Sequence, residues 1–222
     1  MQQTIDEAAL VRFRAAAAQL GITLSAPQLR QMHDYIALLE RWNAVHNLTA
    51  LRDKDELLAS LVFDSLTLAA ALVRHSEGRQ LRVLDVGSGS GFPAAVIAVV
   101  RPTWAVHAID SVSKKTAFIQ QAAVESRIAN LHSLSGRVEK LPAALQFDAV
   151  VSKAFGSLRA LVVSTDRLLE PGGIWVAQKG KYPASELAEL PTEVEAFHVE
   201  PVTVPELDEE RCLVWLRRSE SR

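Results

Sequence analysis

The segment Val83 to Phe92 most constrains the fold of this chain, because an apolar run ends there in three alternating glycines. Glycine adopts positive φ and has no Cβ, so Gly87, Gly89 and Gly91 permit a sharp turn and a close approach of the backbone to a ligand. The apolar segment that follows, Phe92 to Val100, predicts a helix whose first turn directs free N–H groups at that ligand. The pattern predicts a strand, a loop and a helix around a nucleotide-sized crevice.

The spacing of the glycines narrows the choice of cofactor. A dinucleotide fingerprint would place its third glycine at position 92, where this chain has Phe, and no Gly-Lys-Ser/Thr follows to form a Walker loop. A second apolar run, Ala105 to Ile109, ends at Asp110, 19 residues beyond Gly91. An acidic residue at that strand tip is typical of ribose binding. A tight turn without a ligand and a solvated aspartate are the alternatives.

Composition limits the class of protein. With 222 residues, 49% of them hydrophobic and 23% charged, the chain is long enough for one full α/β domain and a small extension. No apolar stretch reaches the roughly 20 residues that span a bilayer, and the first residues lack a secretory signal. The single cysteine, Cys212, cannot form an internal disulfide. We expect a cytoplasmic protein, a monomer, with no membrane partner.

The charge of the chain is unevenly distributed. The net charge is −2, yet residues 111–181 hold ten Lys or Arg against five Asp or Glu. Such a window can attract a polyanion such as RNA to one face, or it can be an ordinary solvated surface. The six histidines show no spacing typical of a metal site, and none is expected.

The order of apolar patterns predicts the architecture. The first 75 residues read as helices, and from Leu81 onward short apolar runs alternate with helical segments. This alternation predicts an α/β, doubly wound, Rossmann-like sheet of seven strands, with the last strand antiparallel because no helix separates the last two runs. We expect a helical extension at 1–75 and a ligand-binding domain at 76–222. The expected helices are 5–20, 25–42 and 53–74, and the expected strands are 81–86, 104–109, 131–134, 147–152, 172–178, 195–201 and 210–217.

Four segments should meet at the carboxyl ends of the parallel strands, where doubly wound sheets bind ligands. These segments are Gly87 to Phe92, Asp110, Ser135 to Glu139, and Ser152 to Phe155.

The run from Asp85 to Gly91 resembles motif I of the S-adenosylmethionine methyltransferases. The chain as a whole resembles the glucose-inhibited division protein B family, bacterial methyltransferases that modify guanine N7 in small-subunit (16S) rRNA. The resemblance covers about Tyr35 to Trp215 and is carried by Trp42-Asn43 with Asn47-Leu48-Thr49-Ala50, Asp64-Ser65-Leu66, Asp85 to Pro93, Asp110 with Lys114-Lys115, Arg137-Val138-Glu139, Ser152-Lys153-Ala154-Phe155 and Lys179-Gly180.

The resemblance implies S-adenosylmethionine as cofactor and small-subunit rRNA or the ribosomal subunit as partner. The expected cofactor-binding residues are Asp85, Gly87, Gly89, Gly91, Phe92, Asp110, Val138, Glu139 and Lys153. Lys153 and Phe155 are the expected catalytic residues, with Phe155 as a stacking platform for the base or, alternatively, a core aromatic. Arg137 and Lys179 are the expected RNA contacts; the alternative for Lys179 is a surface cation.

Three departures from the family pattern limit how far the family's residue roles can be transferred to this chain. The family usually has Arg-His at Ser60-Leu61, Pro-Gly-Ile-Pro at residues 93–96, and Arg at Lys153. Lysine keeps the charge but loses the bidentate fork, so recognition of phosphate or carboxylate there should be weaker.

The residues after the fourth strand agree with attack by guanine N7. That atom already carries an in-plane lone pair, so no general base is needed, and Ser152-Lys153-Ala154-Phe155 is not the Asn/Asp-Pro-Pro-Tyr/Phe motif that grips an exocyclic amine. Catalysis should then consist mainly of positioning. The alternatives are a methyltransferase of the same fold that acts on a small molecule or protein, and a noncatalytic module that binds the cofactor and associates with RNA.

Overall fold

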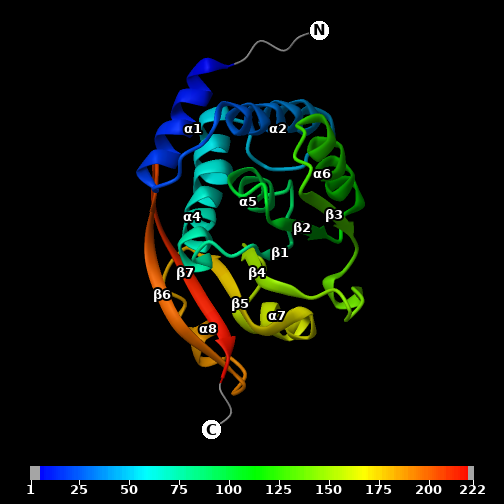
Figure 1. The fold of residues 1–222 in the computed structure, drawn as a ribbon, viewed down its shortest axis with the longest axis vertical. Coiled ribbons are helices and arrows are strands. Elements are labelled where there is room, and N and C mark those ends of the chain that lie inside the picture. Colours follow the sequence, from blue (N-terminus) through cyan, green and yellow to red (C-terminus); the bar gives the residue numbers. More distant parts are fainter. Residues whose placement is uncertain (1–5, 220–222) are drawn as a thin grey trace.

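The computed structural model describes residues 6–219, which form a three-layer α/β structure around one seven-stranded sheet (Figure 1). The strand order is β3-β2-β1-β4-β5-β7-β6. Strands β1 to β5 are parallel, and β7 runs antiparallel to both β5 and β6, so the predicted doubly wound sheet with a terminal antiparallel hairpin is confirmed. The strands are β1 (Arg82–Val86), β2 (Ala105–Asp110), β3 (Leu131–Ser135), β4 (Phe147–Lys153), β5 (Leu169–Lys179), β6 (Val194–Val204) and β7 (Leu207–Arg218).

Helices cover both faces of the sheet. They are α1 (Glu7–Gln19), α2 (Ala26–His46), α3 (Lys54–Leu57), α4 (Asp64–Ser76), α5 (Ala94–Val100), α6 (Ser113–Glu125), α7 (Leu158–Thr165) and α8 (Ala184–Ala188), with a π-helical segment η1 (Leu58–Phe63) and two 3-10 turns, η2 (Val138–Lys140) and η3 (Asp166–Leu168). Helices α2, α4, α5 and α6 share one hydrophobic cluster with the sheet, and α7 shares the other. Successive strand residues alternate between the two clusters, as Val83 and Leu84 do, because side chains in a strand point to opposite faces.

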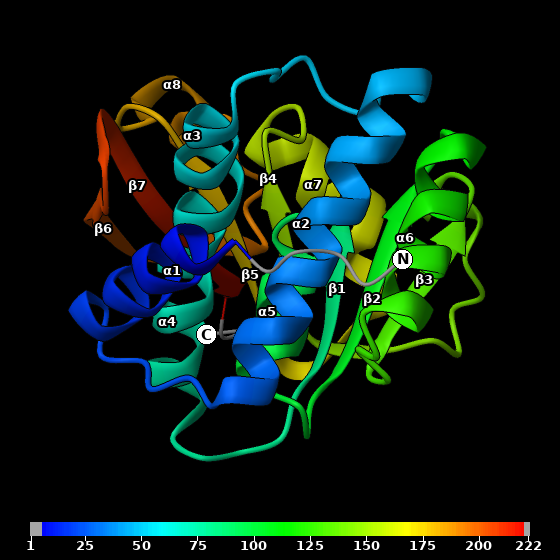
Figure 2. The same ribbon diagram turned by 90° about the horizontal axis from the view of Figure 1, so that it is seen from above.

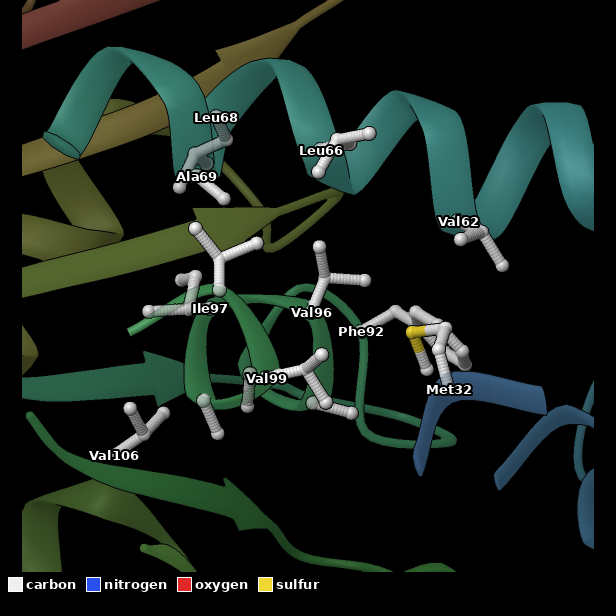
Figure 3. Close-up of a cluster of buried hydrophobic side chains, with 14 of the residues drawn as sticks. Met32, Val62, Leu66, Leu68, Ala69, Phe92, Val96, Ile97, Val99 and Val106 are labelled. Carbon is white, nitrogen blue, oxygen red and sulfur yellow. The ribbon is translucent and has the colours of Figure 1, made fainter. Parts of the chain in front are cut away.

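Helix α5 explains why the residues after the glycine loop are uniformly apolar. All its residues from Ala94 to Val100 are buried. Figure 3 shows Val96, Ile97 and Val99 among side chains from α4, β2 and α2. Each buried Val or Ile side chain contributes about 1.5 to 3 kcal/mol relative to exposure. A helix enclosed on every side has no need of a polar face.

The N-terminal helices follow the predicted order, with two differences in detail. Helix α2 begins at the predicted cap, where Ser25 and Gln28 form a capping box, but it continues past residue 42 to His46. The helix expected at 53–74 is divided into α3, η1 and α4. The start of the first expected helix, residue 5, lies outside the described residues. The helix expected from Phe92 begins at Ala94, because residues up to 93 belong to the loop.

The helical run Lys54–Ser76 is apolar and long enough to cross a membrane by length and composition, but 78% of its most apolar window is buried inside the protein. This is the burial of a core helix. The expectation from the sequence concerned only uninterrupted apolar residues. Asp64 and other polar residues interrupt the apolar residues of this run but do not end the helix, so the run is longer than any such stretch. The boundary proposed at residue 75 falls inside α4, and the cluster that contains α4 also contains strand residues. The two-part division stays a prediction.

Candidate functional site

An open cavity of about 330 Å³ lies at the carboxyl ends of β1 and β2, beside the turn after β4. Asp110 at the tip of β2 and Phe155 after β4 line it, together with residues from the other two predicted segments. The lining residues are Val86, Gly87, Ile109, Asp110, Ser111, Gly136, Arg137, Val138, Glu139 and Phe155. The structure therefore brings together six of the residues predicted for the site: Gly87, Asp110, Arg137, Val138, Glu139 and Phe155.

Gly87 allows the ring of Phe155 to pack against the cavity side of the loop. Its φ is +71°, and a Cβ placed there would lie 2.8 Å from Cδ2 of Phe155. The amides of Gly87 and Ser88 both donate to the carbonyl oxygen of Ile109, at 2.9 and 3.1 Å. These bonds fix the start of the loop against the tip of β2, so the wall at Gly87 is preorganised.

Asp110 joins the loop to the second strand. Its Oδ2 accepts from the amide of Gly89 at 3.0 Å, and its Oδ1 accepts from the amide of Val112 at 2.9 Å. The Nζ of Lys115 lies 3.8 Å from Oδ2. A carboxylate offers about four lone-pair sites, so these partners leave capacity for a hydroxyl donor from the cavity.

The opposite side of the glycine loop is packed against α2. A Cβ at Gly91, where φ is +88°, would lie 2.0 Å from the Oη of Tyr35, which donates to the carbonyl of Ser90 at 3.0 Å. The ring of Phe92 is buried edge-on against Tyr35, with centroids 5.6 Å apart. Gly89, Gly91 and Phe92 do not line the cavity, so direct cofactor contact by these residues stays a prediction.

Asp85 is also buried behind the loop. Its Oδ2 accepts from the amide of Ala94 at 3.1 Å, which joins the end of β1 to the start of α5. Its Oδ1 has no hydrogen-bond partner among residues 6–219. Burial raises the pKa of Asp85 to about 7, although the Ala94 bond and Lys153 oppose this shift.

Lys153 points away from the cavity and into a buried polar cluster. Its Nζ donates to the carbonyl of Ser60 at 2.9 Å and lies 3.6 Å from Oδ2 of Asp64. Oδ1 of Asp64 accepts from Nε2 of Gln178 at 2.5 Å and lies 3.4 Å from Nε of Arg211. Burial lowers the pKa of Lys153 and raises that of Asp64, while the attraction between the two charges opposes both shifts.

This cluster changes the interpretation of Lys153. Asp64 begins α4 and Ser60 lies in η1, so the ammonium group holds the helical extension against the ends of β4 and β5. The structure does not place Lys153 among the lining residues of the cavity, because the buried carboxylate attracts it to the other side. Its predicted contacts with cofactor and substrate stay predictions.

The two cations predicted to contact RNA have different surroundings. The Nζ of Lys179 lies 2.8 Å from Oε2 of Glu186 and donates to the carbonyl of Gly156 at 2.9 Å. Its charge is therefore largely neutralised. Arg137 is exposed at the rim of the cavity, and no carboxylate of the described residues forms an ion pair with it.

Arg167 supports the cavity wall and was not recognised in the sequence. Its Nη1 donates to the carbonyl of Leu141 at 2.5 Å, and its Nη2 donates to that of Val138 at 3.0 Å. One carbonyl belongs to the first residue of η2 and the other to the residue that follows this turn, so the guanidinium fixes the wall that carries Val138 and Glu139. Its partners lie 26 and 29 residues away in sequence, so no local pattern could indicate the role.

Asp64 was noted in a family motif, but no role was assigned to it from the sequence. Its partners come from three separate strands, β4, β5 and β7, so no local pattern could indicate them.

No group of three or more His, Cys, Asp or Glu residues within 6–219 is arranged to hold a metal ion.

A glycine-rich loop after β1, an acid at the tip of β2 and this sheet order together define a Rossmann-like methyltransferase fold. A solved structure of a SAM dependent methyltransferase from Aquifex aeolicus superimposes with a TM-score of 0.55 at 16% identity, over 77% of this chain and 96% of that one. The chain belongs to the family described as rRNA small subunit methyltransferase G, whose model matches residues 28–214.

Two similar curated proteins carry the name Ribosomal RNA small subunit methyltransferase G. The one from Bordetella avium is 44% identical over 216 residues, which cover 97% of this chain and 96% of the relative. The one from Paracidovorax citrulli is 46% identical, over 92% of this chain and 88% of the relative. The resemblance inferred from the sequence motifs is confirmed.

Proposed function

We propose that this protein transfers a methyl group from S-adenosylmethionine to N7 of a guanine in small-subunit rRNA. The observation that carries the proposal is the family match over residues 28–214, together with a cavity formed by the matched segments. The proposal includes a cytoplasmic location and a monomeric state.

The lining residues fit an adenosine-containing cofactor. The ring of Phe155 can lie against Gly87 in the cavity wall only because that residue has no Cβ. Ile109, Val138 and Phe155 supply apolar surface for a flat base, and Asp110 supplies oxygen acceptors for ribose hydroxyls. Arg137 is the only cation among the lining residues, which suits a cofactor without a pyrophosphate. Bound S-adenosylmethionine would supply an electrophilic methyl group.

The protein's contribution is to position the base. Guanine N7 attacks with its own lone pair, so no side chain has to remove a proton first. Phe155 is half-buried at the cavity, where its ring can stack on a base that leaves the RNA fold. Correct alignment of N7 with the methyl group can contribute up to about 7 to 11 kcal/mol to the barrier reduction.

The test uses labelled S-adenosylmethionine and ribosomal small subunits from cells that lack this enzyme. We expect label in rRNA at guanine N7, and label in a protein or metabolite instead would contradict the proposal. Gly87→Asp is the matched inactive variant, because its side chain would collide with the ring of Phe155 and add a further carboxylate to the cavity wall. If calorimetry detects no cofactor binding by the wild-type protein, the proposal fails. Cofactor binding without transfer of label to RNA, protein or metabolite would contradict it as well and would favour the noncatalytic module.

A further inference from the structure

The cations around the cavity differ in whether an acidic side chain neutralises them. On the side of β4 and β5, Lys153 lies against Asp64 and Lys179 against Glu186. On the side of α2 and α6, Arg52 and Lys114 form no ion pair with any acidic side chain in residues 6–219. Only the second group leaves a positive charge for an external partner.

We name the second region the shoulder and define it as residues 41–52 together with 113–115. Figure 2 shows the C-terminal end of α2 beside α6, with the connection to α3 running from it toward the other side of the molecule. Val45 is 73% exposed, and His46, Asn47 and Arg52 are exposed as well. Neither sequence segment of the shoulder contains Asp or Glu. Arg41 lies 3.6 Å from Glu125 and Lys115 lies 3.8 Å from Asp110, so Arg52 and Lys114 carry its uncompensated charge.

The two cations hold the end of α2 without losing their charge. The Nζ of Lys114 donates to the carbonyl of His46 at 2.9 Å, and Nη1 of Arg52 donates to the carbonyl of Asn43 at 2.9 Å. These carbonyls belong to the last turn of α2, where cations are favoured. A carbonyl oxygen is neutral, so it fixes the position of each cation and leaves its field directed to solvent.

The connection after α2 is also fixed in place. The side chain of Asn43 is buried, and its Nδ2 donates to the carbonyl of Leu51 at 2.9 Å while its Oδ1 accepts from the amide of Thr49 at 2.9 Å. A preorganised surface loses little conformational freedom when a partner binds. The shoulder is therefore suited to a rigid, extended anion.

The shoulder is continuous with the cavity. Asp110 and Ser111 line the cavity, α6 begins at Ser113, and Lys115 lies 3.8 Å from Asp110. Arg137 extends the unpaired positive charge along the rim. A phosphate chain held on the shoulder would pass within reach of the cavity mouth.

We propose that the shoulder binds the phosphate backbone of the substrate rRNA and sets the position of the target guanine over the cavity. This inference rests on the proposed function, because it specifies the surface that the same substrate uses. Contacts to phosphate supply affinity and register without reading sequence.

The test is the double variant Arg52→Gln/Lys114→Gln, since glutamine can still donate to the carbonyls of α2 but carries no charge. We expect the KM for undermethylated small subunits to rise about tenfold and the slope of log KM against log salt to fall by about 0.7 to 0.9 per lost phosphate contact. The affinity for S-adenosylmethionine should not change.

Arg79→Gln is the matched control. Arg79 is exposed and donates to the carbonyl of Ser76 at the end of α4, next to the amino end of β1 and so at the opposite edge of the sheet. It should leave both KM and salt slope unchanged. Val45→Glu adds a negative charge at the tip of the shoulder without removing any hydrogen bond, and it should raise KM in a protein of unchanged thermal stability.

An unchanged KM and salt slope in both the double variant and Val45→Glu would overturn the proposal. If the wild-type protein methylates no subunit RNA, the proposed function fails. If the wild type is active and the variants retain its KM, only the assignment of the shoulder fails.

Discussion

The two sides of the glycine loop differ in their surroundings: one side lines the cavity, and the other packs against the rest of the protein. The cavity side presents Gly87 and Phe155 to open space, whereas the far side packs Gly91 against Tyr35 and buries Asp85. Residues of one short motif thus divide between a cavity wall and a structural support. Substitutions on the far side should mainly change folding, and substitutions on the cavity side should mainly change binding.

Gly91→Ala should have the largest effect. The new Cβ would meet the Oη of Tyr35 at 2.0 Å in a backbone conformation that disfavours side chains, so we expect a loss of about 4 kcal/mol or more in the free energy of unfolding. Gly89→Ala, where nothing lies within 4 Å of the added Cβ, should cost only about 1 to 2 kcal/mol. Urea unfolding measures both values.

Tyr35→Phe in the Gly91→Ala protein tests the cause. Removal of the Oη should restore part of the lost stability, because the next atom of the ring, Cζ, lies 3.2 Å from the added Cβ. Equal costs for Gly89→Ala and Gly91→Ala would refute the division of the loop into two sides.

Asp85→Asn should change how stability depends on pH. Because burial raises the pKa of Asp85 in the folded protein from 3.8 to about 7, its carboxyl group stays protonated on folding while the unfolded chain ionises. Its contribution to stability is therefore full below about pH 4 and is lost as the pH rises to about 7. The wild type should lose up to about 4 kcal/mol relative to the variant over this range.

The measurement is urea unfolding of the cofactor-free wild type and variant from pH 4 to 8. Other titrating groups, including His107, whose pKa burial lowers to about 4, occur in both proteins and cancel in the difference. A difference in stability that stays constant with pH would show that the buried carboxyl group does not titrate in this range.

Arg167→Met should have the smallest effect, confined to the cavity side. Without the guanidinium, the turn that carries Val138 and Glu139 is held less firmly, and we expect the Kd for S-adenosylmethionine to rise about fivefold, near 1 kcal/mol. Turnover at saturating cofactor should not change. The affinity for 5′-methylthioadenosine, which has the adenosine part but no amino acid part, should fall by the same factor.

Arg159→Met provides the control, since its guanidinium also donates to a main-chain carbonyl, that of Glu189, outside the cavity lining. It should bind both compounds like the wild type. If Arg167→Met weakens S-adenosylmethionine but leaves 5′-methylthioadenosine unaffected, the adenine does not lie against Val138 and Glu139.

Local patterns in the sequence were sufficient for much of the fold and part of the site. Alternating apolar runs located all seven strands, and Ser25 with Gln28 marked the start of α2, because both signals depend on residues close in sequence. The same holds for Gly87 and Asp110, which end neighbouring parallel strands and must therefore share one edge of the sheet. The interruption of 53–74 by η1 had no comparable local signal.

By itself, the sequence determined the doubly wound sheet, the family and the edge of the sheet that carries the cavity, since periodicity and motif spacing encode these features. Only the tertiary structure decided which residues face the cavity. Lys153 lies against Asp64, Gly91 packs against Tyr35, and Arg167 donates to the carbonyl of Val138. Each of these contacts joins segments that are distant in the chain. The tertiary structure also decided which cations are neutralised. Whether Lys179 or Lys114 is available to RNA depends on which acidic side chains folding places beside each of them.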